Sequence, residues 1–308
     1  MRLLILGAGA TGGYYGGRLA KADDDVTFLV RQARADALKR DGLRVESGKG
    51  DISIPVSTIT RDAIAAPYDA ILLSCKAYDL GAAIEALAPA VGAGTLILPL
   101  LNGMKHIDAL DAAFGPERVL GGTCHISVTL TDDGVIRHFS PFDALTLGPR
   151  SAMQTERCRA LHGILGRGGF EARYSDDVIR AMWEKWVLLA TLAGMTCLMR
   201  GNIGEIVVTK GGAEQINQLL DECCATASAA GAAPRDESVA MTRTVLTDPS
   251  STMSASMRRD LERGARIEAD HILGDLLSRA VASGVPTPLL ATAYRHVQVY
   301  QNRLEKPA

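Results

Sequence analysis

The first third of the chain alternates short apolar runs with stretches that favour helix formation. The runs are nearly continuous, as is typical of strands covered on both faces of a parallel sheet. They occupy Leu3–Leu6 and residues 26–30, 68–75 and 95–100. Helices are predicted over residues 14–21 and 80–91. This alternation predicts an α/β fold with a doubly wound parallel sheet of the Rossmann type.

The pattern then changes to shorter strands. Leu43–Glu46 and residues 52–56 flank the sequence S-G-K-G-D and predict a hairpin. Between residues 119 and 147, β-prone runs are separated by the turn-forming sequences D-D-G and S-P-F-D. We therefore expect antiparallel strands to complete the first domain.

From residue 177 onward the pattern is helical almost without interruption. The predicted helices cover Val178–Met199 and residues 214–229, 254–283 and 288–303. We therefore place a domain boundary near residue 173, so that residues 1–173 form a Rossmann-type domain and residues 174–308 form an all-α domain. Because ligands commonly bind between domains, the cleft between these two is the expected site.

The first apolar run breaks directly into the glycine cluster G-A-G-A-T-G-G-Y-Y-G-G, which fits G-x-G-x-x-G between two predicted strands. Gly7 permits the tight turn, Gly9 lets the main chain approach a pyrophosphate, and Gly12 lets the helix pack closely on the strand. The N–H groups of Ala10 and Thr11 follow at the positive end of the helix dipole, where an anion is favoured. The pattern predicts a dinucleotide site, and the alternative is a glycine-rich turn without a ligand.

The end of the second strand indicates which dinucleotide is bound. NAD-specific sites place Asp or Glu there to hold the ribose 2′-hydroxyl. This chain instead reads F-L-V-R-Q-A-R, with Arg31 at the strand end and Arg34 one helical turn later. Because a guanidinium binds a phosphate in bidentate fashion, we predict NADP (NADPH) as the cofactor. The alternative is that Arg31 is an ordinary surface arginine.

Composition and charge exclude several classes of partner. The 308 residues carry 33 basic and 35 acidic side chains, a balance that argues against a nucleic-acid partner. After the first strand, the longest uncharged apolar stretch is residues 186–199, which is too short to cross a bilayer as a helix. No basic segment precedes the first apolar run. We expect a soluble, cytoplasmic chain without a membrane segment.

The six cysteines show no C-x-x-C motif, and the six histidines show no metal-ligand spacing, so no metal site is predicted. We expect reduced cysteines that mostly serve packing. A redox-active pair at Cys223 and Cys224 is the alternative.

Four polar residues stand where chemistry is plausible. Lys76 and Asn102 each follow a predicted strand, and ligands of open α/β sheets bind beyond the carboxyl ends of strands. Lys185 shares an apolar helix face, where burial would lower the pKa of its ammonium toward neutrality and suit it to donate a proton. Glu268 lies in the charged segment R-R-D-L-E-R-G-A-R-I-E-A-D. The alternatives are a turn or capping role for Lys76 and Asn102, a Lys185 ammonium that reaches water, and a place on a solvated helix face for Glu268.

Together these stretches resemble the ketopantoate reductase family (2-dehydropantoate 2-reductase) over nearly the whole chain. The matching motifs are G-A-G-A-T-G-G-Y-Y-G, V-T-F-L-V-R with the NADP-selecting Arg31, S-C-K-A, L-N-G-M, W-E-K and S-M-R-R-D-x-x-x-G-x-x-x-E-x-D-x-I-x-G. The resemblance implies an NADPH-dependent reduction of the C2 ketone of a 2-oxo acid, of the type used in pantothenate biosynthesis.

The resemblance also implies roles for individual residues. Lys185 would stabilise the developing alkoxide and supply or relay its proton, and Glu268 would bind the hydroxyl of the substrate. Asn102 and Ser256 would orient the substrate. Lys76 would lie near the nicotinamide, and Asn102 would also contact the cofactor.

The chain departs from the family's pattern in its second half. The family places asparagines four and eight residues after the catalytic lysine, where this chain has Leu189 and Ala193. Ile267 and Ala269 replace a threonine and an isoleucine beside the glutamate. Because an unpaired buried hydroxyl would cost about 1–3 kcal/mol, we keep open a different 2-oxo acid that lacks the hydroxyl of ketopantoate.

Two other functions fit part of the pattern. One is another dehydrogenase with a Rossmann-type domain and a helical domain, acting on a hydroxy acid or on glycerol 3-phosphate. The other is a non-catalytic NADP-binding sensor, which only the missing asparagines favour. The apolar helical half also offers a surface for a homodimer.

Overall fold

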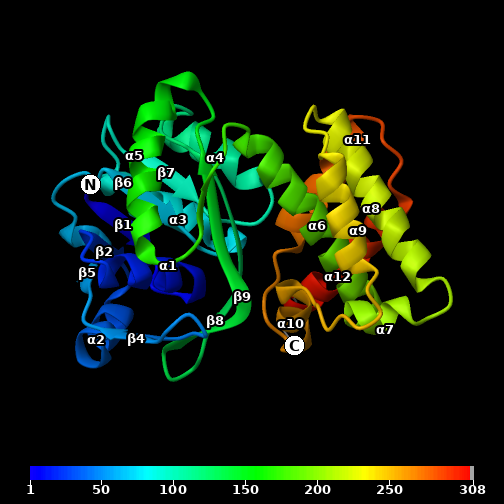
Figure 1. The fold of residues 1–308 in the computed structure, drawn as a ribbon, viewed down its shortest axis with the longest axis horizontal. Helices are drawn as coiled ribbons and strands as arrows, with labels where there is room; N and C mark the ends of the chain where they lie inside the picture. Colours follow the sequence, from blue (N-terminus) through cyan, green and yellow to red (C-terminus); the bar gives the residue numbers. More distant parts are fainter. Residues whose placement is uncertain (306–308) are drawn as a thin grey trace. The chain divides into compact units, whose positions relative to one another are not determined.

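The computed structural model describes residues 1–305, which form two compact units. The first unit comprises Met1–Leu101 and His106–Val178, and the second comprises Asn102–Lys105 and the described residues from Ile179 onward. The first unit contains the strands, and the second consists of helices (Figure 1). The domain boundary near residue 173 stays a prediction. The grouping of Asn102–Lys105 with the helices was not expected from the sequence.

A five-stranded parallel sheet forms the core of the first unit, in the order β5-β2-β1-β6-β7. Its strands are β1 (Leu3–Leu6), β2 (Val26–Leu29), β5 (Ser57–Ile59), β6 (Ala70–Leu73) and β7 (Leu96–Pro99). The chain order reverses between β1 and β6, and open α/β sheets bind ligands beyond the carboxyl ends of the strands at such a switch point. The doubly wound parallel sheet expected from the sequence is confirmed.

The same part of the chain supplies five α-helices and the strands of a second sheet. The helices are α1 (Ala10–Lys21), α2 (Gln32–Asp41), α3 (Leu80–Leu87), α4 (Lys105–Phe114) and α5 (Thr155–Leu165). The second sheet contains β3 (Leu43–Glu46), β4 (Ile52–Ile54), β8 (Gly121–Leu130), β9 (Val135–Gly148) and β10 (Ala172–Tyr174). The predicted hairpin, β3 with β4, and the expected antiparallel pair, β8 with β9, are both confirmed.

The glycines inside α1 let this helix pack closely against both sheets. A Cβ atom at Gly16 would lie 2.7 Å from ring carbons of Phe28 in β2, and one at Gly17 would overlap the side chain of Leu43 in β3. A glycine in a helix interior costs about 1 kcal/mol relative to alanine. Apolar contacts made at this close approach offset that loss.

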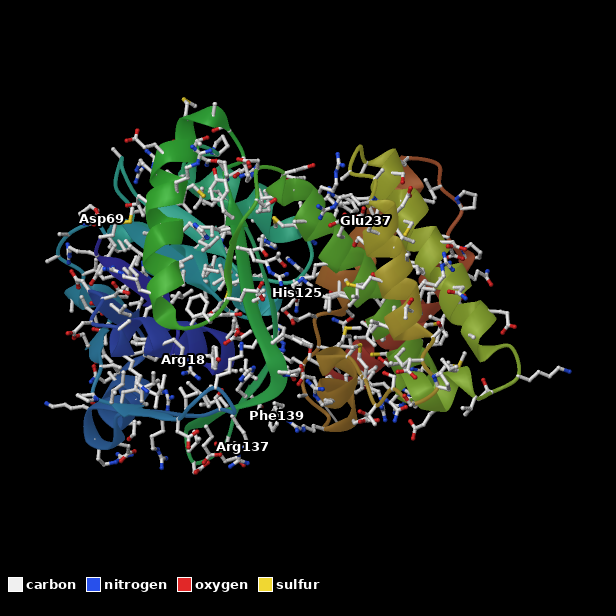
Figure 2. All side chains as sticks on the ribbon, viewed as in Figure 1. Arg18, Asp69, His125, Arg137, Phe139 and Glu237 are labelled. Carbon is white, nitrogen blue, oxygen red and sulfur yellow. The ribbon has the colours of Figure 1, made fainter. Side chains whose placement is uncertain are left out.

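Buried polar groups around Asp143 of β9 also tie α1 to the second sheet. The fully buried carboxylate accepts hydrogen bonds from Tyr14 Oη at 2.7 Å and from Lys49 Nζ at 2.5 Å. Arg18, labelled in Figure 2, lies over the Tyr14 ring and donates to the carbonyl oxygens of Lys49 and Gly50. Burial raises the pKa of Asp143, but the hydrogen bonds from Lys49 and Tyr14 outweigh it, so the pKa lies below its usual value.

Replacing Asp143 with asparagine is expected to lower the free energy of unfolding by about 1–3 kcal/mol at pH 7, since the charge-assisted bonds are lost. The folded-state pKa of Asp143 is depressed, so its contribution is fully present above the unfolded pKa of about 3.9, declines below that value and is lost as the pH falls through the folded-state pKa. Urea denaturation at pH 7 and at pH 3 measures this: the two proteins should differ at pH 7 and converge in acid. Asp132→Asn, in the exposed loop before β9, is the control, and equal losses in both variants would contradict the account.

The second unit is built from helices joined by short connections. They are α6 (Val178–Met199), α7 (Ile203–Val207), α8 (Gly212–Ala229), α9 (Asp236–Leu246), α10 (Ser256–Glu262), a π-helical turn (Asp270–Gly274), α11 (Asp275–Ala282) and α12 (Pro288–Glu305). The all-α second half is confirmed. The α6 helix carries Arg180, Glu184 and Lys185 in its first half. No helix within residues 1–305 is both long and apolar enough to span a membrane.

The single helix predicted over residues 254–283 is wrong. The chain leaves the helical conformation after Glu262, and Gly264 takes φ +71°, a left-handed conformation that glycine adopts readily. Residues 265–268 are irregular, and the helix resumes through the π turn that precedes α11. Glu268 therefore does not lie on a solvated helix face, the alternative left open from the sequence.

Candidate active site

The glycine loop joins β1 to α1 at the switch point of the parallel sheet. Gly7 takes φ +85°, and Gly9 immediately precedes the helix. A Cβ atom at Gly12 would lie 2.6 Å from Gly7 O and would overlap Ser74 Oγ, whereas one at Gly9 would meet no atom within 4 Å. Gly12 is therefore required for packing, while the main chain at Gly9 borders open space at a helix N-terminus. This cradle fits the pyrophosphate of a dinucleotide.

Alanine substitutions at the two glycines are expected to have different effects. Gly12→Ala should destabilise the fold by about 1–3 kcal/mol because the added methyl group overlaps main-chain and side-chain atoms. Gly9→Ala should lower stability by less than about 1 kcal/mol, the effect of alanine at a helix N-cap. It should nevertheless weaken NADPH binding, because its methyl group occupies the space through which the pyrophosphate approaches. Thermal unfolding and a fluorescence titration with NADPH measure both effects; unchanged NADPH binding in Gly9→Ala would contradict the assignment.

Two arginines follow β2 beside this loop. Arg31 is exposed at the position that precedes α2, so its guanidinium is available to solvent at the strand end. Arg34 is partly buried, and its Nη2 donates to Ala8 O in the glycine loop at 3.1 Å. Burial lowers the pKa of Arg34, and the nearby Arg44 lowers it further. Of the two arginines, Arg31 is exposed at the strand end, whereas Arg34 is hydrogen-bonded to the glycine loop.

Lys76 comes three residues after the end of β6, on the other side of the switch point from β2. It is partly buried and precedes a short 3-10 helical turn at Ala77–Asp79. Ser74, between β6 and Lys76, donates its hydroxyl to Leu6 O at 3.4 Å. This places Lys76 at the carboxyl edge of the sheet, beyond which open α/β sheets bind ligands.

In the second unit, the structure brings together two of the residues predicted from the sequence. Lys185 on α6 is only 8% exposed, and its Nζ donates to Asn102 Oδ1 at 3.1 Å. The following Gly103 takes φ +77°, and a Cβ atom there would lie 2.8 Å from His271 O. A side chain at position 103 would therefore displace the turn that presents Asn102 to Lys185.

Glu268 lies two residues before the start of the π turn of the same unit and is also only 8% exposed. Its main-chain oxygen accepts the N–H groups of His271 at 3.2 Å and Ile272 at 3.0 Å. Trp186, the residue after Lys185, donates its indole N–H to Ile272 O at 2.9 Å. The segment that carries Glu268 is thus hydrogen-bonded to α6 next to Lys185.

Ser256 is the exposed first residue of α10. The N–H of the preceding Ala255 points to Thr196 Oγ1 on α6, at 3.4 Å. Thr196 lies eleven residues, about three helical turns, after Lys185, so it shares that helix face. The start of α10 is therefore held against the far end of the face that carries Lys185.

Comparison with known proteins agrees with this division of the chain into two units. The family profile described as "Ketopantoate reductase PanE/ApbA" matches residues 3–152, and the profile "Ketopantoate reductase PanE/ApbA C terminal" matches residues 177–301. The chain belongs to the ketopantoate reductase family. The resemblance drawn from the sequence motifs is thereby confirmed, and the protein is an oxidoreductase of this family.

Individual relatives cover nearly the whole chain. An "Uncharacterized oxidoreductase YkpB" of Bacillus subtilis is 36% identical over 302 residues, which span 98% of this chain and 99% of that protein. The crystal structure of a PanE/ApbA family ketopantoate reductase from Ralstonia eutropha has a TM-score of 0.89 at 28% identity, covering 99% of this chain and 100% of that one. A D-mandelate dehydrogenase solved with NADH and anilino(oxo)acetate also has a TM-score of 0.89, with coverage of 99% and 100%. At 21% identity, this last likeness concerns the fold alone.

The two positions at which the chain departs from the ketopantoate reductase pattern lie on the helix of Lys185. Leu189 is half-buried, and Ala193 is only 2% exposed. Residues four and eight positions after Lys185 fall on the same face of a helix as Lys185. The face that carries the lysine therefore continues as an apolar surface.

Sequence reasoning missed Trp186 and His271 in this member of the ketopantoate reductase family. Trp186 is 1% exposed and has the pattern of an ordinary core residue, so only its hydrogen bond to Ile272 reveals a specific contact. His271 packs beside Gly103, and burial lowers its pKa to about 4, so the imidazole is neutral at physiological pH. Asp275 opposes this shift, and Lys105 adds to it.

The adjacent cysteines do not have the properties of a redox pair. Burial raises the pKa of Cys223 to about 12 and that of Cys224 to about 11. Because the thiolate is the nucleophile in thiol chemistry, both thiols are poor nucleophiles at neutral pH.

Proposed function

We propose that the protein uses NADPH to reduce 2-dehydropantoate (ketopantoate), or a closely related 2-oxo acid, to the corresponding 2-hydroxy acid. The buried ammonium of Lys185, hydrogen-bonded to Asn102 at 3.1 Å, carries the proposal. It supplies a positive charge and a proton donor in one group, which is what the reduction of a ketone to an alcohol requires. Membership of the ketopantoate reductase family supports the reaction type.

The first unit would bind the cofactor. Main-chain N–H groups at the start of α1 would hold the pyrophosphate beside Gly9, and the exposed Arg31 would bind the 2′-phosphate of NADPH. Lys76 would lie near the nicotinamide. NADPH, when bound, supplies the hydride that adds to C2 of the substrate.

The second unit would bind the substrate and manage its charge. Lys185 would stabilise the negative charge that develops on the ketone oxygen and would give that oxygen a proton from Nζ, which water then restores. Asn102, which accepts a hydrogen bond from Nζ, would orient the ammonium and the substrate. Ser256 would help to orient the substrate, and Glu268 would accept a hydrogen bond from the substrate hydroxyl, if the substrate carries one.

A substrate with an apolar side chain is the second candidate, and Leu189 and Ala193 favour it. A hydroxyl group left without a partner against these side chains would cost about 1–3 kcal/mol. Burying an apolar substituent there would instead contribute about 0.8 kcal/mol for each CH₂ group. The hydride chemistry would be the same for both candidates.

A panel of ketones tests the proposal through the loss of NADPH absorbance. Ketopantoate, 2-oxoisovalerate, 4-methyl-2-oxopentanoate and phenylglyoxylate represent the 2-oxo acids, and dihydroxyacetone phosphate represents phosphorylated substrates. We expect turnover of one or more 2-oxo acids. The double variant Leu189→Asn, Ala193→Asn should shift the preference toward ketopantoate by about ten- to a hundredfold, the equivalent of about 1–3 kcal/mol. Activity confined to the phosphorylated ketone, or tight NADPH binding without turnover of any ketone, would contradict the proposal.

The proposal includes a cytoplasmic location and a homodimer formed through the helical half. Analytical ultracentrifugation tests the oligomeric state. A monomer at micromolar concentration would remove the dimer from the proposal without affecting the reaction.

A further inference from the structure

The π-helical turn Asp270–Gly274 touches the chain next to three of the residues proposed to act on the substrate, Lys185, Asn102 and Glu268. Glu268 precedes the turn, and its main-chain oxygen accepts hydrogen bonds from His271 and Ile272. Gly103, which follows Asn102, packs so closely on the turn that a Cβ atom there would lie 2.8 Å from His271 O.

The third contact is made by Trp186, which follows Lys185 on α6. Its indole Nε1 donates to Ile272 O, the main-chain oxygen in the middle of the turn, at 2.9 Å. A π turn inserts one extra residue into a helix, so its carbonyl groups depart from the regular i→i+4 pattern, and such turns are frequent at functional sites. This bond directly links the helix that carries Lys185 to the segment that carries Glu268.

We propose that Trp186 is a positioning residue, whose indole N–H bond to Ile272 O fixes the ammonium of Lys185 relative to Glu268. This inference rests on the proposed function, because it concerns the same site. The Trp186 ring is 1% exposed, so the bond is shielded from water and its carbonyl partner has no solvent to replace a lost donor. Removing the N–H group alone would let the π turn and α6 move apart without emptying the core.

Trp183 provides a matched control, since the chain contains only these two tryptophans. The two rings pack against each other with centroids 4.8 Å apart, and Trp183 is 3% exposed. The Arg279 guanidinium lies 5.8 Å from the Trp183 ring centroid and 5.7 Å from that of Trp186. The indole N–H of Trp183, however, makes no hydrogen bond within residues 1–305. The two tryptophans thus share their packing and differ in the hydrogen bond.

The experiment compares Trp186→Phe with Trp183→Phe by two readouts. The first is steady-state kinetics with NADPH and the best 2-oxo acid of the panel. Trp186→Phe should lower kcat by about ten- to a hundredfold, the usual effect of a displaced reacting group, with the KM for NADPH unchanged within about twofold.

The second readout is the acetylation rate of Lys185 by acetic anhydride, measured by mass spectrometry relative to the exposed Lys210. That ratio should change by about threefold or more in Trp186→Phe, because the surroundings of the amine set its reactivity. Trp183→Phe should leave both readouts within about twofold of wild type.

Equal effects of the two variants would overturn the inference, because they would show that ring packing, not the hydrogen bond, matters. Unchanged kcat and labelling in Trp186→Phe would also overturn it. If the wild type reduces no 2-oxo acid, the proposed function fails, and the labelling ratio alone then decides the inference. If Trp186→Phe does not fold, 3-benzothienylalanine at position 186 replaces it, since this residue keeps the ring size and lacks the N–H group.

Discussion

Replacing Lys185 with alanine is expected to lower kcat for 2-oxo acid reduction by about 10²–10⁴-fold, the usual contribution of a positioned proton donor. The ammonium is buried and held at 3.1 Å from Asn102 Oδ1, so water cannot easily take its place at the ketone oxygen. The variant should bind NADPH with nearly unchanged affinity, because the glycine loop and Arg31, proposed to hold the pyrophosphate and the 2′-phosphate, lie in the first unit. Stopped-flow kinetics with saturating NADPH separates the chemical step from binding.

Lys210→Ala is the matched control, since Lys210 is an exposed lysine of the same unit. It should leave kcat and both KM values unchanged. Lys185→Arg adds a second comparison: it keeps the charge but, with a guanidinium that does not lose its proton at working pH, should recover little of the activity. A kcat for Lys185→Ala within about threefold of wild type would remove the lysine from the chemistry.

Replacing Arg31 with alanine is expected to raise the KM for NADPH by about ten- to a hundredfold, the equivalent of a lost charge-assisted bond worth about 1.5–3 kcal/mol. The KM for NADH should change little, because NADH has no 2′-phosphate. The structure places this guanidinium exposed at the end of β2, where the ribose of a dinucleotide is expected. The ratio of kcat/KM for the two cofactors measures the effect and also decides whether wild type prefers NADPH.

Arg40→Ala is the control for charge on the same helix. Arg40 is exposed near the end of α2 and pairs with Asp41 at 2.7 Å, so its removal should leave the cofactor ratio unchanged. A wild-type preference for NADH, or an unchanged ratio in Arg31→Ala, would show that Arg31 is an ordinary surface residue.

The sequence predicts the parts of the fold that depend on repeated local patterns. Continuous apolar runs marked the central strands of the parallel sheet, and the glycine motif marked the turn into α1. The edge strand Ser57–Ile59 was missed, because it is short and partly exposed and has no apolar run. The interruption after Glu262 was missed as well. Charged residues are frequent both in helices and in irregular segments, so the charged sequence around Gly264 did not reveal the end of the helix. The left-handed conformation of Gly264 is visible only in the structure.

The sequence motifs named Lys185, Asn102 and Glu268 as candidates, but they did not predict how these residues come together. Lys185 and Asn102 are 83 positions apart, and the motifs around them carry no information on their distance in space. The link through Trp186 and Ile272 uses a main-chain oxygen, and a main-chain acceptor leaves no trace in the sequence. The buried Asp143 was assigned to a turn, since S-P-F-D has turn composition, and only the structure shows its bonds to Tyr14 and Lys49.

The most direct measurement is a crystal structure of the protein with NADP⁺ and a 2-oxo acid bound. The account predicts the pyrophosphate on the main-chain N–H groups that follow Gly9, and the Nζ atom of Lys185 within hydrogen-bond distance of the ketone oxygen, next to the nicotinamide ring. An amine that stands too far from that oxygen to reach it, even through one bridging water, would contradict the account.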